Sequence, residues 1–363
     1  PYLYSNQISR ENVMKDTITP LNYTKEAIKD LSVMEKGLRS NAPLTSYIMR
    51  QVIDMLDSSV KFILPNCCDI IEPEEYRQTH FDLARLPYPV VTFEIPWFKD
   101  NVETQIGDFN ISPSSRRIAL CWEARQSFEP IPGCNSILNT YIDGGVFILP
   151  VSWSDDLKIW ILGVGGMFFP YNNKLTKYEP DRTLPASRLV IDTLKENGVA
   201  KYNAAHFKAE PFITSMEFKD DLIKQVGSIE RLYAQIIMDT RDELQAFIQA
   251  CSVLNCENVC PVTLSTKPER KFINGRKVQP PEKNKRPSYT YKVLQLSETK
   301  VQSNHTGTGK SGGTKRMHLR RGHIRRKNNK LIWIRPAMIN ANSRAGIVDK
   351  DYQINIRKEE NKP

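Results

Sequence analysis

Long apolar runs are missing from this sequence. The longest apolar stretches, residues 144–153 and 159–170, are of strand length and are interrupted by glycine and proline, whereas a membrane-spanning helix needs about 20 consecutive apolar residues. The first residues, Pro-Tyr-Leu-Tyr-Ser-Asn, also lack the basic start and the apolar stretch of a secretory signal. We therefore expect a cytoplasmic protein that has no membrane partner.

Cysteine is scarce and shows no metal-binding pattern. The chain has seven cysteines in 363 residues, an odd number, and no two of them are spaced as Cys-x-x-Cys. Disulfide frameworks and structural zinc sites need denser or more regular cysteine spacing. The sequence therefore predicts reduced, partly buried thiols and no bound metal.

Nucleotide-binding signatures are missing as well. Gly163-Val-Gly-Gly166 does not follow the order of the dinucleotide fingerprint, and no helix is expected directly after it. Gly309-Lys-Ser311 lacks the earlier glycine of a phosphate-binding loop and lies in a low-complexity stretch. We expect no cofactor.

No catalytic constellation stands out either. A metal-dependent nuclease needs clustered carboxylates or an activated histidine. Glu94 and Glu123 fall within neighbouring expected strands, but nothing in their spacing brings them together, and His80 and His206 are isolated. A nuclease remains an alternative for which no catalytic residue can be assigned.

What the chain does have is positive charge concentrated in one segment. Residues 266–330 hold 19 lysines and arginines against three acids, a net +16, whereas residues 1–265 carry a net −8. This asymmetry predicts an acidic body with a separate basic module that engages an anion. A basic linker that keeps the chain soluble, or that docks on its own acidic body, would give the same distribution.

The hydrophobic pattern predicts an α+β fold, with helices flanking an antiparallel sheet. Strand-like runs rich in β-branched and aromatic residues follow one another without a long helix between them, which favours antiparallel pairing. They cover residues 90–95, 117–125, 145–153 and 158–169. Helical spacing predicts two helices within residues 24–64, the second from Thr45 to Leu64. It also predicts a helix at 185–197 and a long one at 220–253, which Gly227 or Asp239-Thr240 divides into two.

Three segments follow from this pattern. Residues 1–85 are expected to form a helical amino-terminal region and residues 86–265 an α+β body. Residues 266–363 are expected to form the basic β module, which includes a flexible loop at 302–315 rich in glycine, serine and threonine.

Within the basic module we expect strands at 288–296, 316–326 and 331–339. Asparagine tolerates positive φ, so Lys327-Asn-Asn-Lys330 is suited to a hairpin turn between the last two. Alternation would place His318 and His323 on opposite faces unless Gly322 supports a bulge, and this spacing is poor for a metal pair.

The candidate binding residues of this module share a positive charge or an aromatic ring. Arginine forks suit phosphate groups and aromatic rings can stack on bases. The candidates for anion binding are His318, Arg320, Arg321, His323, Arg325, Arg326 and Arg335, and those for stacking are Tyr289, Tyr291 and Trp333. Trp333 would equally suit the core of a small barrel, and one or two of the arginines could pair with acids of the body.

The segment Met317-His-Leu-Arg-Arg-Gly-His-Ile-Arg-Arg326, followed by Lys330-Leu-Ile-Trp-Ile-Arg-Pro336 and Ile339-Asn340, resembles a family of phage and mobile-element proteins. Their carboxy termini carry a His-x-Arg-Arg-Gly-His-x-Arg signature. The similarity is specific over residues 316–340, loose over 86–340, and does not reach residues 1–85. In two respects the chain departs from the pattern: Ile324 follows the second histidine, where an aromatic residue is frequent, and the hairpin is short.

That family includes a type V-A anti-CRISPR, which blocks production of an effector nuclease by engaging its nascent peptide. The resemblance therefore implies a non-catalytic protein of the host-cell cytoplasm that binds a host or defence component, with partners among RNA, the ribosome, a nascent peptide or a defence protein. The residues alone also fit a general nucleic-acid-binding protein of phage expression or replication, and the nuclease alternative stays open.

Overall fold

The computed structural model describes residues 20–99, 104–200, 206–263 and 289–296, together with seven short strands between residues 272 and 348. The expected flexible loop at 302–315 lies outside the described residues. The α-helices are α1 (Tyr23–Leu38), α2 (Pro43–Ser58), α3 (Gln78–Leu83), α4 (Pro185–Glu196), α5 (Lys219–Val226) and α6 (Ile229–Leu254). The 3-10 helices are η1 (Asn66–Cys68), η2 (Pro73–Glu75), η3 (Cys134–Asn139), η4 (Pro180–Arg182) and η5 (Met216–Phe218). Among the described helices, none has the length and apolar character needed to span a membrane.

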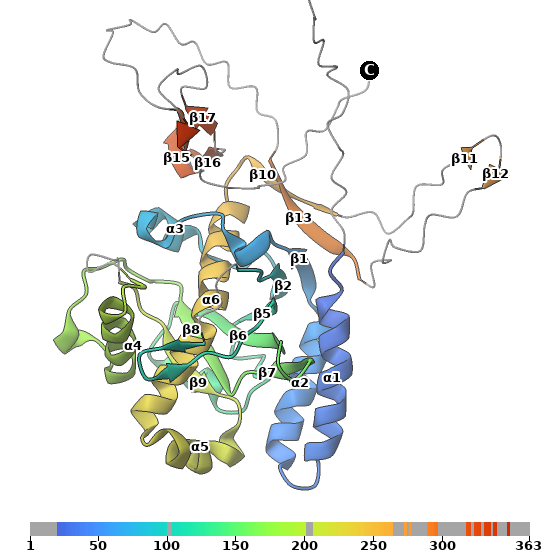
Figure 1. Ribbon diagram of the computed structural model, residues 1–363, viewed down its shortest axis with the longest axis vertical. Coiled ribbons are helices and arrows are strands. Elements are labelled where there is room, and N and C mark those ends of the chain that lie inside the picture. The colour runs from blue at the N-terminus through green and yellow to red at the C-terminus, as the bar shows by residue number, and fades with distance from the viewer. Residues whose placement is uncertain are drawn as a thin grey trace, which may run out of the picture.

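A nine-stranded mixed sheet forms the centre of the molecule (Figure 1). Its strand order is β10-β13-β1-β2-β5-β6-β8-β9, and β7 pairs with β6 beside β8. These strands are β1 (Val60–Ile63), β2 (Val90–Pro96), β5 (Arg116–Glu123), β6 (Gly145–Ser154), β7 (Ile159–Leu162), β8 (Gly165–Pro170), β9 (Glu210–Ile213), β10 (Val259–Thr263) and β13 (Tyr291–Leu296).

The remaining strands form small separate sheets. They are β3 (Gln105–Ile106), β4 (Phe109–Asn110), β11 (Phe272–Ile273), β12 (Arg276–Lys277), β14 (Met317–Arg320), β15 (His323–Lys327), β16 (Lys330–Ile334), β17 (Ala337–Ile339) and β18 (Ile347–Val348). Three of these sheets have two strands each, β3-β4, β11-β12 and β15-β16, and the fourth has the order β17-β14-β18.

The large sheet has an apolar core on each face. Side chains alternate along a strand, so Ile118, Leu120 and Trp122 of β5 pack with helices α1 and α2. Ala119 and Cys121 of the same strand pack on the other face with α6. Because both faces of β5 are covered, its residues from 117 to 122 are all buried. The α+β prediction, with helices flanking the sheet, is confirmed.

Helix α2 is shorter than expected, because its last predicted turn is a strand. The helix ends at Ser58, Ser59 has extended backbone angles, and residues 60–63 form β1. The apolar spacing of Val60 and Ile63 fits a helix as well as a strand, and pairing with β2 and β13 on both sides decides the matter. The prediction of a helix as far as Leu64 was therefore wrong.

Glycine follows the ends of two helices, α4 and α5. Gly198 follows the end of α4 with a φ of 71°, and Gly227 separates α5 from α6 with a φ of 97°. Positive φ is unstrained for glycine, which makes it the usual residue after a helix end. Of the two division points considered for the long helix, Gly227 is the one that the chain uses, while Asp239-Thr240 lies within α6.

Parallel pairing occurs at one end of the sheet, in addition to the expected antiparallel pairs. Strand β1 pairs in parallel with both β2 and β13, whereas β2, β5, β6, β8 and β9 are successively antiparallel. The sheet therefore takes strands from each of the three segments that the sequence suggested as domains. It takes β1 from the first, β2, β5 to β9 and β10 from the second, and β13 from the third.

A chain cut after residue 263 is therefore expected to lose stability, because β1 becomes an edge strand and the fully buried Tyr291 ring is removed. Loss of a buried aromatic side chain costs about 3–5 kcal/mol. A chain cut after residue 297 keeps β13 and is the matched control. Urea unfolding followed by circular dichroism should give a clearly lower midpoint for the shorter chain. Equal midpoints for the two truncations would contradict the placement of β13 in the central sheet.

Candidate nucleic-acid interface

The basic segment forms the predicted hairpin. Strands β15 and β16 are antiparallel, and Lys327 pairs with Lys330 across the two asparagines. Further from the turn, β14 and β17 pair from Arg320–Ala337 to His318–Ile339, in the register that one unbroken hairpin would have. The expected continuous strand 316–326 is nevertheless described as two strands, β14 and β15, which belong to different small sheets.

Two residues, Ile324 and Glu257, make the described contacts that attach the β15–β16 hairpin to the body. Ile324 packs against the core cluster on the α6 face of the sheet. Just beyond the end of α6, the Glu257 backbone N–H donates to the Leu331 carbonyl oxygen at 3.1 Å, and the Lys330 Nζ donates to Glu257 Oε2 at 2.7 Å. The hairpin is therefore held by one apolar side chain and one acidic residue of the body.

Arg325 and Arg326 remain exposed beside this anchor. Neither guanidinium has a carboxylate partner in the part of the chain that the structure describes. Each offers a planar fork that matches a phosphate group. These two are the predicted anion-binding residues whose side chains the structure places in solvent.

For some of the other candidate residues of the motif the structure describes only the backbone, and the rest lie outside the described residues. His318 and Arg320 lie on β14, His323 on β15 and Trp333 on β16. Arg321 and Arg335 lie outside the described residues. No cluster of three or more potential metal-ligating side chains occurs within the described ranges.

The two tyrosines proposed for base stacking lie in the body of the molecule. Tyr291 on β13 is fully buried, and its hydroxyl donates to Glu94 Oε1 at 3.0 Å. A ring without exposed surface cannot stack on a base, so Tyr291 belongs to the core. Tyr289 is half-buried, and its hydroxyl donates to Asp57 Oδ1 at 2.8 Å. The Lys61 ammonium lies over the Tyr289 ring, 4.1 Å from the ring centre.

Glu94 is the centre of a buried polar cluster at the start of α1. Its carboxylate accepts the backbone N–H groups of Tyr23 at 3.2 Å and Thr24 at 2.9 Å, as well as the Tyr291 hydroxyl. Burial raises the pKa of Glu94, and these hydrogen bonds oppose the rise. The carboxylate thus caps a helix whose Asn22 N-cap makes no side-chain cap bond.

Lys61 lies in the same cluster and is 2% exposed. Its ammonium donates to the carbonyl oxygens of Asp57 at 2.7 Å and Ser59 at 2.9 Å. Burial lowers the pKa of Lys61 to about 8, against the attraction of Asp57 and Glu94. The cluster joins α1, α2, β1, β2 and β13, and every charged group in it has a structural partner.

The two carboxylates considered for a nuclease do not meet. Glu94 pairs with Ile118 across the strands, and Glu123 is five residues further along β5, about 17 Å at the rise of a strand. Glu123 is bound instead to Arg125 and to the Tyr171 hydroxyl, which donates to it at 3.4 Å. A shared metal between these two residues has no geometric support.

Sequence reasoning missed a second buried ionic cluster, between β5 and α6. Arg117 Nη1 lies 3.1 Å from Glu243 Oε1 and 3.4 Å from Asp242 Oδ2. The Trp97 ring lies 4.8 Å from the Arg117 guanidinium. Glu243 has no exposed surface, and burial raises its pKa to about 7 in spite of the arginine. An arginine within an apolar strand was the signal that could have revealed this cluster.

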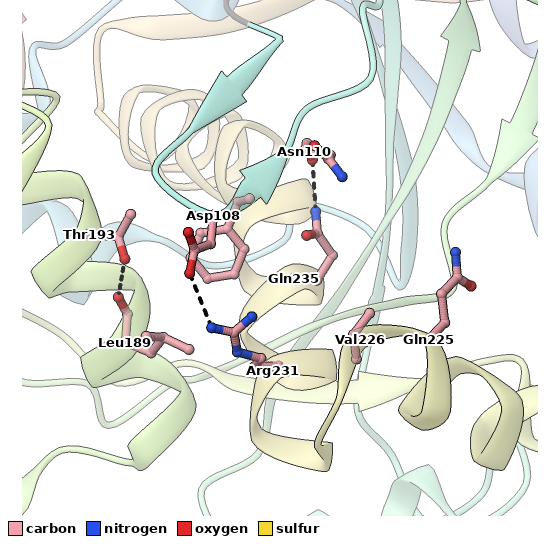
Figure 2. A pocket seen from close by; sticks show the side chains of 9 residues that line it. Asp108, Asn110, Leu189, Thr193, Gln225, Val226, Arg231 and Gln235 are labelled. Carbon is pink, nitrogen blue, oxygen red and sulfur yellow. Dashed lines mark hydrogen bonds and ion pairs between the residues drawn. The ribbon is translucent and has the colours of Figure 1, made fainter.

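A cavity of about 250 Å³ lies between α4, the β3–β4 hairpin and the α5–α6 corner (Figure 2). Its polar groups bind one another: Arg231 pairs with Asp108 at 3.1 Å, and Gln235 Nε2 donates to the Asn110 carbonyl oxygen at 3.0 Å. Thr193 Oγ1 likewise donates to the Leu189 carbonyl oxygen. Because these donors already have protein acceptors, this cavity is a weaker candidate than the exposed arginines of the hairpin.

Comparison with known proteins gives one finding. A family model described as AcrVA2-like, the anti-CRISPR type V subtype A2 family, matches residues 71–341. No curated protein and no solved structure matches the chain. The matched region runs from the segment before α3 to the end of the basic hairpin, and so includes the strands β2 to β13 and the anchor at Glu257. Because the match covers most of its length, the chain belongs to the anti-CRISPR type V subtype A2 family.

Proposed function

We propose that this protein is a non-catalytic anti-CRISPR factor that binds a component of the host or its defence system and contacts RNA through the β15–β16 hairpin. Membership of the family supports the first part. We also propose that the segment of residues 316–340 is a signature of the family. In this view the hairpin brings the protein to RNA, or to RNA within a ribosome, and the body engages the protein component.

The observation that carries the RNA contact is the exposure of Arg325 and Arg326 on an anchored hairpin. Ile324 and Glu257 hold the hairpin that carries the two arginines, so less backbone freedom is lost when the arginines bind. The high positive charge of residues 266–330 adds attraction at long range. The general nucleic-acid-binding alternative shares this surface and differs in needing no protein partner.

Replacement of both Arg325 and Arg326 by alanine should weaken RNA binding and flatten its dependence on salt. Each phosphate contact on a single strand contributes about 0.7 to the slope of log K against log salt, so the slope should fall by roughly 1.4. Fluorescence anisotropy over a salt series measures it. Arg182→Ala with Lys224→Ala, two exposed cations on η4 and α5, is the matched control. An unchanged slope in the hairpin variant would remove these arginines from the binding site.

A pull-down from host cells, with and without RNase, separates the protein partner from the RNA. A defence or ribosomal protein that remains bound after RNase treatment supports the anti-CRISPR proposal. Recovery of RNA alone, with every protein lost after RNase, would instead favour the general nucleic-acid-binding alternative.

A further inference from the structure

We infer that the nucleic-acid surface continues from the hairpin onto the body and is built for a single strand, RNA or DNA. This inference rests on the proposed function and adds to it the form of the ligand and the residues of the body that contact it. Two cation–aromatic pairs next to the hairpin anchor carry the argument: Arg85 with Tyr171, and Lys292 with Tyr88.

The Arg85 guanidinium lies 4.4 Å from the centre of the Tyr171 ring. Arg85 is exposed, whereas Tyr171 is half-buried and its hydroxyl is fixed by Glu123. The ring therefore supports the guanidinium from beneath and leaves the arginine accessible from outside. An unpaired base can stack on such a guanidinium plane.

In the second pair, Tyr88 belongs to the same chain segment as Arg85, whereas Lys292 lies on β13. Lys292 Nζ is 5.6 Å from the centre of the Tyr88 ring, and both side chains are half-buried. Tyr88 follows Arg85 by three residues, so their Cα atoms are at most about 10 Å apart. A strand of a few nucleotides that stacks on Arg85 can thus bring a phosphate to Lys292.

The hairpin and this segment are attached to neighbouring residues of the body, Glu257 and Asn255. Asn255 Nδ2 donates to the carbonyl oxygens of Leu83 at 3.0 Å and Arg85 at 2.9 Å. Two residues later, Glu257 holds β16. Tyr88 and Ile324 also pack against the same core cluster. Because Asn255 and Glu257 are two residues apart, the two parts of the surface are neighbours.

The charges of this region favour an anionic ligand. The cations of this surface are Arg85, Lys292, Arg325 and Arg326, and two of the three acids described beside them are paired with other cations: Glu257 with Lys330 and Glu123 with Arg125. The third, Asp82, accepts from the neutral Gln78 amide at 2.9 Å and keeps its charge. A duplex would meet these cations through its phosphates, but its bases are stacked on one another and cannot cover Arg85. A flat cationic plane beside aromatic rings therefore distinguishes a single strand from a duplex.

The test measures the affinity of the full chain for oligo(U), for oligo(dT) and for a blunt duplex of the same length. Arg85→Ala should weaken binding of the single strand roughly tenfold, as expected for one lost stacking contact, and should change duplex binding far less. Arg85→Lys keeps the charge but lacks the plane, so it should lose most of the same affinity while the salt dependence is retained. Arg182→Ala is the control for an exposed arginine elsewhere.

The outcomes separate base stacking at Arg85 from nucleic-acid binding by the hairpin arginines. Loss on oligo(U), on oligo(dT) or on both supports the inference and identifies the strand. Equal loss on single strand and duplex, or full recovery by Arg85→Lys, overturns stacking at Arg85. If Arg85→Ala has no effect while the Arg325 and Arg326 double variant is impaired, this inference fails and the proposed function stands. If no nucleic acid binds at all, both fail.

Discussion

Replacing Arg117 with methionine is expected to lower the free energy of unfolding by about 3–5 kcal/mol, the usual cost of removing one partner from a buried ion pair. Glu243 would then be left without its cation in the core between β5 and α6, since Asp242 carries the same sign. Chemical denaturation followed by tryptophan fluorescence or circular dichroism measures the loss. Arg125→Met, which removes an exposed ion pair with Glu123, should cost less than about 1 kcal/mol.

The same variant should depend on pH in a defined direction. The pKa of Glu243 is raised from 4.5 to about 7 in the folded protein, so its contribution to stability is fully present below about pH 4.5 and is lost as the pH rises through 7. Removing Arg117 withdraws the attraction that opposes this rise. The loss caused by Arg117→Met should therefore be larger at pH 8 than at pH 5. A loss that is the same at both pH values would show that Glu243 does not depend on Arg117.

Replacing Glu94 with leucine should be of similar severity, because three donors lose their acceptor at once. The N–H groups of Tyr23 and Thr24 would be buried without partners, and the Tyr291 hydroxyl would keep only its longer bond to Asn22 Oδ1 at 3.4 Å. At about 1–3 kcal/mol for each of the two unsatisfied N–H groups, the expected loss is roughly 2–6 kcal/mol. Thermal or urea unfolding measures it, and the amide protons at the start of α1 should exchange faster.

Two further variants define the role of this carboxylate. Tyr291→Phe removes only one of the three donors and should cost less than Glu94→Leu. Glu94→Gln keeps the shape but turns one acceptor into a donor, so its cost should also be intermediate. If Glu94→Gln left the stability unchanged and abolished cleavage of nucleic acid, the structural role assigned here would be wrong and the nuclease alternative would return.

Local signals in the sequence were sufficient for most of the fold. The apolar run of β5 and the glycine after α5 specify their elements through short-range chemistry, and the adjacent asparagines between Lys327 and Lys330 predicted the hairpin. The sequence did not predict β1, because the spacing of the apolar residues Val60 and Ile63 fits a helix as well as a strand. Only pairing with residues far along the chain decides between the two.

The candidate site was harder to predict, because partners distant in sequence determine which side chains face solvent. Tyr289 and Tyr291 belong to the same strand-like segment, yet the Tyr291 hydroxyl bonds to Glu94, 197 residues away, and its ring is buried in the core. Ile324 lies between His323 and Arg325 in a basic segment, and its apolar side chain was the only hint of an anchor. Nothing in the sequence around Glu257 indicated that it would hold the hairpin.

The position of β13 has a consequence for how the chain folds as it is synthesised. Tyr289 bonds to Asp57 across 232 positions, and the neighbouring strand completes the sheet beside β1. Contacts of such long range form slowly, because a large loop must close before they are made. Until residues near 291 have left the ribosome, β1 has an unpaired edge and Glu94 lacks one of its donors. The body should therefore reach its final stability only after the polypeptide has been translated well beyond β13.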